Sequence, residues 1–109
     1  MPTNYKVLGQ SAPSATTDTT LYTVPSATET VVSSIVVANR DSAAATFRIA
    51  VRPDGATIAN QHYLAFDVTV GGSDSTIITI GATMNAADVI TVRGSTANLS
   101  FTAFGSEIS

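Results

Sequence analysis

Apolar and polar residues alternate along most of this chain with the two-residue period of β-strands. The clearest example is the run Thr46–Arg52, in which the apolar side chains at every second position, from Phe47 to Val51, point the same way. The run Val31–Ala38 is apolar on both faces, which is typical of a strand that is covered on both sides. Turn-forming residues fill the break Asn39–Ser42, so the pattern predicts a β-hairpin with Val31–Ala38 as a central strand.

Further runs of the same character are separated by short turn signals. They cover residues 4–10, 19–24, 62–70, 74–80, 88–94 and 99–104. The clearest turns are Pro53-Asp54-Gly55 and Gly71-Gly72-Ser73, and residues 95–98 are expected to close a hairpin between the last two strands. We therefore predict an all-β single domain over residues 1–109, an antiparallel β-sandwich of about eight strands with a jelly-roll-like or Ig-like order.

Alternation also predicts which side chains form the core. Phe47 and Phe101 lie on expected core faces and are the largest side chains there. In the run 62–70, four apolar residues are expected to share the buried side: Leu64, Phe66, Val68 and Val70.

The first 17 residues are expected to be partly an extended N-terminal arm. Residues 11–17 are small and polar and contain Pro13, a composition that is typical of a loop. Such an arm can reach a neighbouring copy of the chain, so Tyr5 and Pro13, both within the first 17 residues, are candidate interface residues.

The charge and cysteine content excludes several classes of function. Only 12% of the residues are charged, about half the usual share, and the net charge is −3. The five basic residues are scattered, whereas nucleic-acid binding needs clustered Lys and Arg. The absence of cysteine excludes disulfides, thiolate metal sites and cysteine nucleophiles. No apolar run is long enough to cross a bilayer, and no signal-peptide pattern is present, so we expect neither a membrane partner nor export by a standard signal.

The candidate catalytic chemistry is sparse. His62 is the single histidine, and a Ser–His62–Asp67 arrangement is formally possible, but no nucleophile elbow accompanies it. The acidic residues lack the spacing of an EF-hand, and a calcium site built from separate loops is a minor alternative. We therefore predict a protein that is not an enzyme, and we assign no catalytic, cofactor-binding or metal-binding residues.

Arg48 and Arg52 share one face of their predicted strand. One interpretation is a solvated outer face on which the arginines meet cross-strand partners such as Asp67. The other is an interface that docks onto an acidic neighbouring subunit. The first interpretation is favoured, and both remain open from the sequence.

Strand sequences along nearly the whole chain resemble those of a known family. The segments that carry the resemblance are LYTVP (21–25), VVSSIVVANR (31–40), FRIAVRPDGA (47–56), HYLAFDVTV (62–70), DVITVRGSTANLSF (88–101) and FGSEIS (104–109). The chain is similar to small virion structural proteins of tailed bacteriophages, cyanophages among them. The resemblance implies a non-enzymatic, β-rich module that assembles on the particle, and it supplies no functional residues.

From this resemblance we expect a capsid decoration, or cement, protein that stabilises contacts between major capsid subunits. The expected partners are the major capsid protein or other virion proteins and further copies of the chain in a homotrimer. The expected location is the virion, assembled in the bacterial host cytoplasm. One alternative is a neck, baseplate or tail-fibre-associated structural protein of the same virion. A further alternative is a glycan-binding module, which would need exposed aromatic rings.

Overall fold

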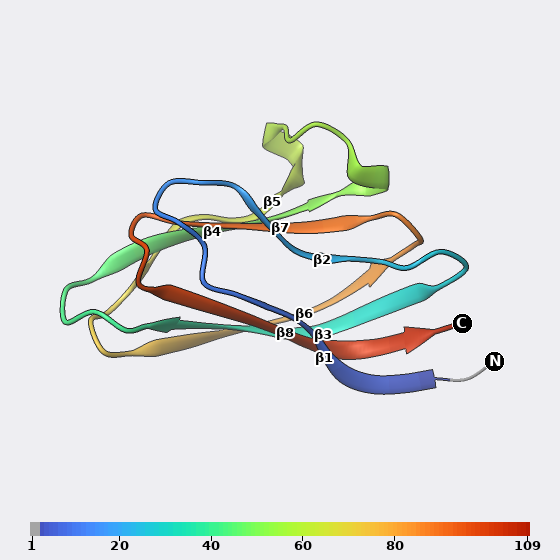
Figure 1. Ribbon diagram of the computed structural model, residues 1–109, viewed down its shortest axis with the longest axis horizontal. Coiled ribbons are helices and arrows are strands. Elements are labelled where there is room, and N and C mark those ends of the chain that lie inside the picture. Colours follow the sequence, from blue (N-terminus) through green and yellow to red (C-terminus); the bar gives the residue numbers. More distant parts are fainter. Residues whose placement is uncertain (1–2) are drawn as a thin grey trace.

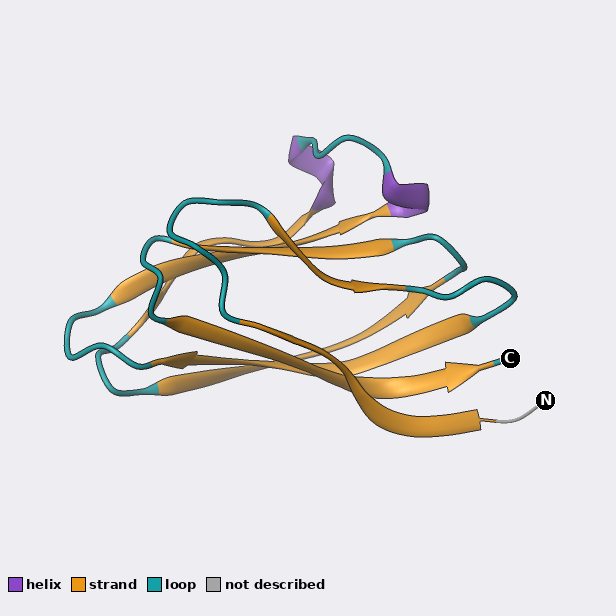
Figure 2. Cartoon of the chain, viewed as in Figure 1, coloured by secondary structure: helices purple, strands orange, loops and turns teal. Residues whose placement is uncertain are grey.

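Two four-stranded antiparallel sheets face each other and enclose the core (Figure 1). The computed structural model describes residues 3–109. The first sheet contains, in spatial order, β1 (Thr3–Ser11), β8 (Leu99–Ile108), β3 (Glu29–Asn39) and β6 (Ser75–Met84). The second contains β2 (Thr19–Thr23), β7 (Val89–Gly94), β4 (Ala45–Arg52) and β5 (Tyr63–Val70). Two short 3₁₀ turns, η1 (Pro53–Gly55) and η2 (Asn60–His62), lie above the second sheet (Figure 2).

The strand order is that of a jelly roll. Every connection except β4–β5 crosses from one sheet to the other, so neighbours in sequence rarely pair. The eight predicted strands are all present, and the predicted antiparallel β-sandwich is confirmed. Of the two orders expected from the sequence, the jelly-roll-like one is the order found. Strands β6 and β8 continue beyond their predicted ends, to Met84 and Ile108.

The predicted core faces of β4, β7 and β8 are confirmed. Phe47 and Phe101 come from opposite sheets, are almost fully buried, and meet edge to face with their ring centroids 6.2 Å apart. Ile49 and Ile90 are equally buried between the sheets. Because the two inner faces alternate with outer ones, each strand contributes about every second residue to this layer.

The predicted hairpin of residues 31–38 and 46–52 is wrong. Strand β3 belongs to the first sheet and β4 to the second, so the two strands do not pair with each other. Both bury one face toward the same core, and the five residues between them, 40–44, carry the chain from one sheet to the other. The hairpin expected across residues 95–98 is wrong for the same reason, because β7 and β8 lie in different sheets.

The predicted apolar face of β5 is also partly wrong. The register of β5 against β4 shifts on both sides of Ile49, and Asp67 has a positive φ of 52°. These bulges turn Phe66 away from the core, so that its side chain lies beneath the guanidinium of Arg48. Val70 is buried as expected, whereas Leu64 is half exposed.

The N-terminal segment is an integral part of the sandwich and not a free arm over the residues that the structure describes. Strand β1 pairs with β8 along its whole length, and the backbone N–H of Thr16 donates to the carbonyl of Gly94. Residues 1–2, the start of the expected arm, lie outside the described residues. The expectation of an extended arm is therefore wrong for residues 3–17.

Candidate interaction surface

The two outer faces of the sandwich differ in charge. Outward-facing positions of the β1-β8-β3-β6 sheet carry mainly hydroxyl and aliphatic side chains, and we call this surface the neutral face. Register and exposure assign to it Tyr5, Val7, Val31, Ser34, Val36, Ser75, Ile77, Thr79, Ser100, Thr102, Phe104 and Ser106. Among the described residues of these four strands, Glu29 at the first position of β3 is the charged residue on this side, at its margin. Lys6 and Glu107 lie on the inner side and bind each other.

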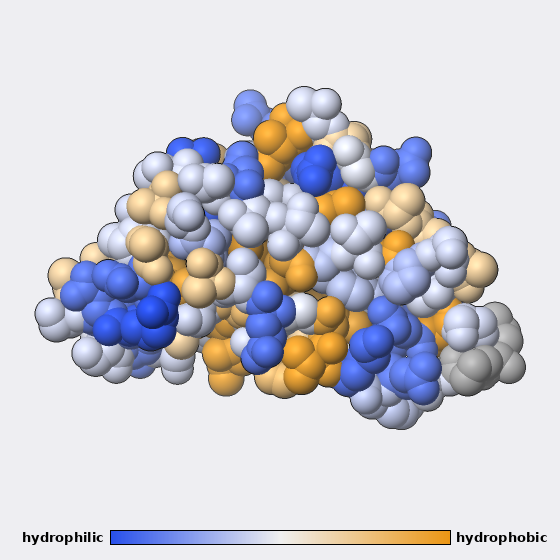
Figure 3. Space-filling model, in the orientation of Figure 1, coloured by the Kyte–Doolittle hydropathy of each residue, from blue (hydrophilic) through white to orange (hydrophobic). Residues whose placement is uncertain are grey.

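Four apolar residues of the neutral face gather around the β1–β8 ladder. Val7 lies opposite Phe104 across the β1–β8 ladder, and a shallow hollow beside them is lined by Tyr5, Lys6, Val7, Val31, Ser33, Phe104, Gly105 and Ser106. Tyr5 is 85% exposed and Phe104 is 38% exposed. Figure 3 shows hydrophobic side chains along the lower margin of the molecule, over this sheet and between hydrophilic ends.

Strand β3 explains why this face is a candidate for contact. Its position between β8 and β6 confirms that it is central in its sheet. Its inner residues are buried, but Val31 and Val36 on its outer side are only half-buried, because no other part of the described chain covers them. The expectation that β3 is covered on both faces is therefore wrong for the isolated chain. An apolar strand face of this kind suits a surface that a partner covers.

The outer face of the β2-β7-β4-β5 sheet is charged. Arg48 donates to Asp67 across the β4–β5 ladder at 2.7 Å, and its guanidinium lies 4.0 Å from the centroid of the Phe66 ring. The hydrogen bond from Arg48 lowers the pKa of the Asp67 carboxyl, and the same bond raises the pKa of Arg48. Asp67 is therefore the cross-strand partner that the sequence indicated for Arg48.

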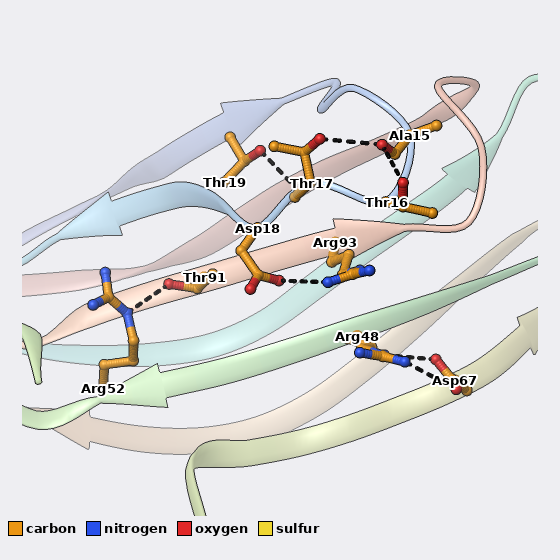
Figure 4. A network of polar contacts seen from close by, with 10 residues as sticks. All are labelled: Ala15, Thr16, Thr17, Asp18, Thr19, Arg48, Arg52, Asp67, Thr91 and Arg93. Atoms are coloured by element: carbon orange, nitrogen blue, oxygen red, sulfur yellow. Dashed lines mark hydrogen bonds and ion pairs between the residues drawn. The ribbon is translucent and has the colours of Figure 1, made fainter. Parts of the chain in front are cut away.

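The other arginines of this face also have partners within the chain (Figure 4). Arg93 lies directly opposite Arg48 in the β4–β7 ladder, an unfavourable pairing of like charges that is relieved by Asp18, 3.7 Å from Arg93. Arg52 donates to the hydroxyl of Thr91 at 3.0 Å and to two carbonyls, that of Gly55 in the η1 turn and that of Ala56 just after it. Arg48 and Arg93 thus face carboxylates of the chain itself, whereas Arg52 donates to neutral oxygens only. All three arginines would have to give up these contacts to bind an acidic partner.

The four candidate interface residues are spread over the molecule. Arg48 and Arg52 share the charged face, as expected from their spacing. Tyr5 projects from the neutral face, on the opposite sheet. Pro13 is buried by the chain itself, so it does not lie on a surface open to a partner. Tyr5 is therefore the predicted residue that belongs to the candidate interaction surface.

The sequence reasoning missed Phe104 and Ile77. Both could have been found from the alternation of their strands. Phe104 directly follows Ala103, the last residue of the inward-facing series Leu99, Phe101 and Ala103, and Ile77 directly precedes Ile78. Side chains of opposite parity point to opposite sides of a strand. An aromatic or aliphatic residue at an outward-facing position of a strand therefore indicates an exposed apolar face.

His62 has a structural role in the chain. Its Nδ1 atom accepts a hydrogen bond from the backbone N–H of Ala59 at 3.0 Å, which closes the η2 turn. The carboxylate of Asp67 receives Arg48, so it does not orient the imidazole. Among residues 3–109, no three His, Cys, Asp or Glu side chains gather closely enough to hold a metal ion.

No family model matches this chain, and no curated protein matches it either. Within residues 3–109 there is no helix with the length and apolar character needed to span a membrane.

Proposed function

We propose that this chain is a structural protein of a bacteriophage virion, a capsid decoration protein that binds the outside of the head through its neutral face. The observation that carries the proposal is the difference in charge between the two outer faces. A face whose charges, Glu29 and Arg40, lie at its two ends can be desolvated against a partner at lower cost than a face that carries arginines and carboxylates along its strands.

The physical basis of the activity is repeated surface burial. Each copy would cover a junction between major capsid subunits, and a modest contact gains strength because it is repeated over the shell. Tyr5 and Phe104 are the side chains best placed to anchor this contact, because aromatic residues dominate the energetics of protein interfaces. The jelly-roll order is compatible with such a role, but a fold alone does not establish a function.

The direct test is the copy number of the chain in purified particles of the phage that encodes it. Densitometry against the major capsid protein should give hundreds of copies per particle, on the scale of a shell component. A few to a few dozen copies would instead support the alternative, a neck, baseplate or tail-fibre-associated protein. Absence of the chain from washed particles would overturn both.

A matched pair of substitutions tests the neutral face itself. Phe104→Lys puts a charge on the neutral face, and Phe66→Lys puts one on the charged face. The two residues have similar exposure, 38% for Phe104 and 53% for Phe66. We expect Phe104→Lys to reduce the occupancy of the chain on particles at least tenfold, and Phe66→Lys to leave it near normal. Equal occupancy for the two variants would show that the neutral face does not dock. Circular dichroism and the melting temperature check that both variants fold.

The glycan-binding alternative would use exposed aromatic rings. On the charged face, the guanidinium of Arg48 covers one side of the Phe66 ring, and Tyr63 meets that ring edge to face at 4.9 Å. These contacts favour a packed cluster over an open sugar platform. Binding on a glycan array that is lost in Phe66→Ala would support the alternative.

A further inference from the structure

Strand β6 is an open sheet edge of unusual composition. A sheet edge presents unpaired backbone N–H and C=O groups, and natural proteins usually protect it with charges, bulges or a covering segment. The sequence of β6 is STIITIGATM, ten residues without a charge. Its residues 75–79 pair with β3 in an uninterrupted register. The register shifts only beyond Thr79, near Gly81, which has a positive φ of 56°.

The other three edge strands of the described chain are protected. Strand β5 is bulged twice and carries Asp67, and β2 is only five residues long. Strand β1 has a register shift next to Leu8 and carries the charged Lys6. Strand β6 therefore has the longest regular and uncharged stretch among the four edges.

Ile77 lies at the middle of this regular stretch. It is 65% exposed, more than any other large aliphatic side chain of the eight strands, and it points outward from the sheet. Val36 lies directly opposite it on β3 and is half-buried. The two side chains form the start of an apolar strip that ends abruptly at the sheet edge.

We propose that β6 pairs antiparallel with β6 of a second copy of this chain, around a two-fold axis at Ile77. The register centred on Ile77 places Ser75 opposite Thr79 of the second copy and Thr76 opposite Ile78. The N–H of Ser75, which donates to the carboxylate of Asp74 in the single chain, would exchange this bond for one to Thr79. Ile77 then meets its own counterpart. In this arrangement the outward-facing and inward-facing side chains of the two copies match, because positions on both sides of the axis have the same parity.

A second copy fits this edge for two physical reasons. A strand that pairs with itself brings identical charges together, and β6 carries none, so the contact has no like-charge repulsion to overcome. The pairing also extends the apolar strip across the axis, with Val36 and Ile77 of each copy in line. Aliphatic β-branched pairs of this kind stabilise neighbouring strands.

The product is a dimer with one continuous eight-stranded sheet. A two-fold contact of this kind is closed, because each β6 edge is used up by its partner. It therefore gives a dimer in place of the homotrimer expected from the sequence. The inference goes beyond the proposed function, since it concerns the purified chain alone and holds whether or not the chain binds a capsid.

The test uses charge-swapped variants at the axis, measured by sedimentation velocity over a concentration series. The unmodified chain should approach twice its monomer mass of 11.2 kDa. Ile77→Lys and Ile77→Glu should each weaken self-association at least roughly a hundredfold, because like charges then meet at the axis. An equimolar mixture of the two variants should restore the dimer, since opposite charges meet in the mixed pair.

Matched controls at Leu64, a half-exposed residue on the β5 edge, test whether the effect is local. Leu64→Lys should dimerise like the unmodified chain. A monomeric unmodified chain at the highest concentration would overturn the proposal. So would charge variants of Ile77 that are not rescued by mixing, because β6 would then pair with another strand such as β1. Circular dichroism of each variant confirms that the chain is folded.

Discussion

The phenol of Tyr22 donates a hydrogen bond to the carboxylate of Glu107, and this bond joins the two sheets at one end of the core. Tyr22 lies on β2 and Glu107 on β8, 85 positions apart in the sequence. The hydroxyls of Tyr22 and Thr30 are 2.8 Å apart, and Lys6 donates to the other carboxylate oxygen at 2.9 Å. Four strands thus converge on one buried carboxylate whose polar partners are all supplied by the chain.

The pH dependence of stability should reflect this pair. Burial raises the pKa of Tyr22 to about 12, with the bond to Glu107 as the second cause. The neutral phenol therefore contributes about 2–3 kcal/mol to the free energy of unfolding below pH 10, and this contribution is lost as the pH rises toward 12. Hydrogen bonds from Tyr22 and Lys6 lower the pKa of Glu107, so its contribution is present above pH 4.5 and is lost as the pH falls through the lowered value.

Tyr22→Phe is the variant that tests this linkage. It should destabilise the fold near neutral pH by about 1–3 kcal/mol, because Glu107 loses a donor inside the core. The loss of stability at low pH and the loss at high pH should both become smaller in this variant. Urea unfolding midpoints across the pH range provide the measurement, and Tyr5→Phe, at an exposed ring, is the control. If Tyr22→Phe lost as much stability above pH 10 as the unmodified chain, another group would be the cause of that loss.

Truncation of the buried aromatic pair should be severe. Phe47→Ala or Phe101→Ala leaves a cavity between the sheets and should cost about 3–5 kcal/mol in the free energy of unfolding. The matched control is Phe104→Ala on the neutral face, which should cost less than about 1 kcal/mol. Chemical denaturation gives all three values. Comparable costs for the buried and exposed positions would contradict the assignment of the core.

Gly9 allows close approach of the two sheets. A Cβ atom at this position would meet the backbone oxygen of Leu21 on β2 far inside normal contact distance, so β1 or β2 would have to move. Gly9→Ala should therefore lower stability by roughly 1–3 kcal/mol. The control is Gly71→Ala, where the nearest atom lies at an ordinary 3.6 Å and little change is expected. Equal melting temperatures for the two variants would show that the contact relaxes without cost.

Asn39 links two loops at the opposite end of the sandwich. Its buried side-chain amide donates to the carbonyls of Ala43 at 2.9 Å and Gly71 at 3.2 Å, and its oxygen accepts from the N–H of Asp41. Asn39→Asp replaces the donor with an oxygen that faces these carbonyls, and should cost about 2–4 kcal/mol. Thermal unfolding should show a clearly lower melting temperature for Asn39→Asp. The control Asn60→Asp, at an exposed position, should change the melting temperature little.

Much of the local structure could be predicted because a strand's alternation depends only on neighbouring residues. The eight strands and the inward positions Phe47, Ile90 and Phe101 follow directly from period-two patterning. The turn at Pro53-Asp54-Gly55 was predictable because Gly55 adopts a positive φ that glycine tolerates. The bulges in β5 were not predictable, since they depend on how β4 packs beside it.

The candidate surface could be predicted only in part. The alternation placed Arg48 and Arg52 on one side of β4, and the structure confirms this. It could not show that Arg48 and Arg93 face carboxylates of the same chain, because Asp18 and Asp67 reach them from distant positions in the sequence. Nor could it show that Tyr5, Phe104 and Ile77 share a face, since their strands meet only after the chain has crossed between sheets.

The sequence by itself determined that this chain forms β-strands, where most of them lie, and which side chains of each strand are apolar. The tertiary structure decided which strands pair, and through that pairing it separated a neutral face from a charged one. The physical reason is that strand formation is encoded in local alternation, whereas sheet pairing joins backbone groups from distant parts of the chain. A strand such as β6 acquires a free edge only when its neighbours in space are known.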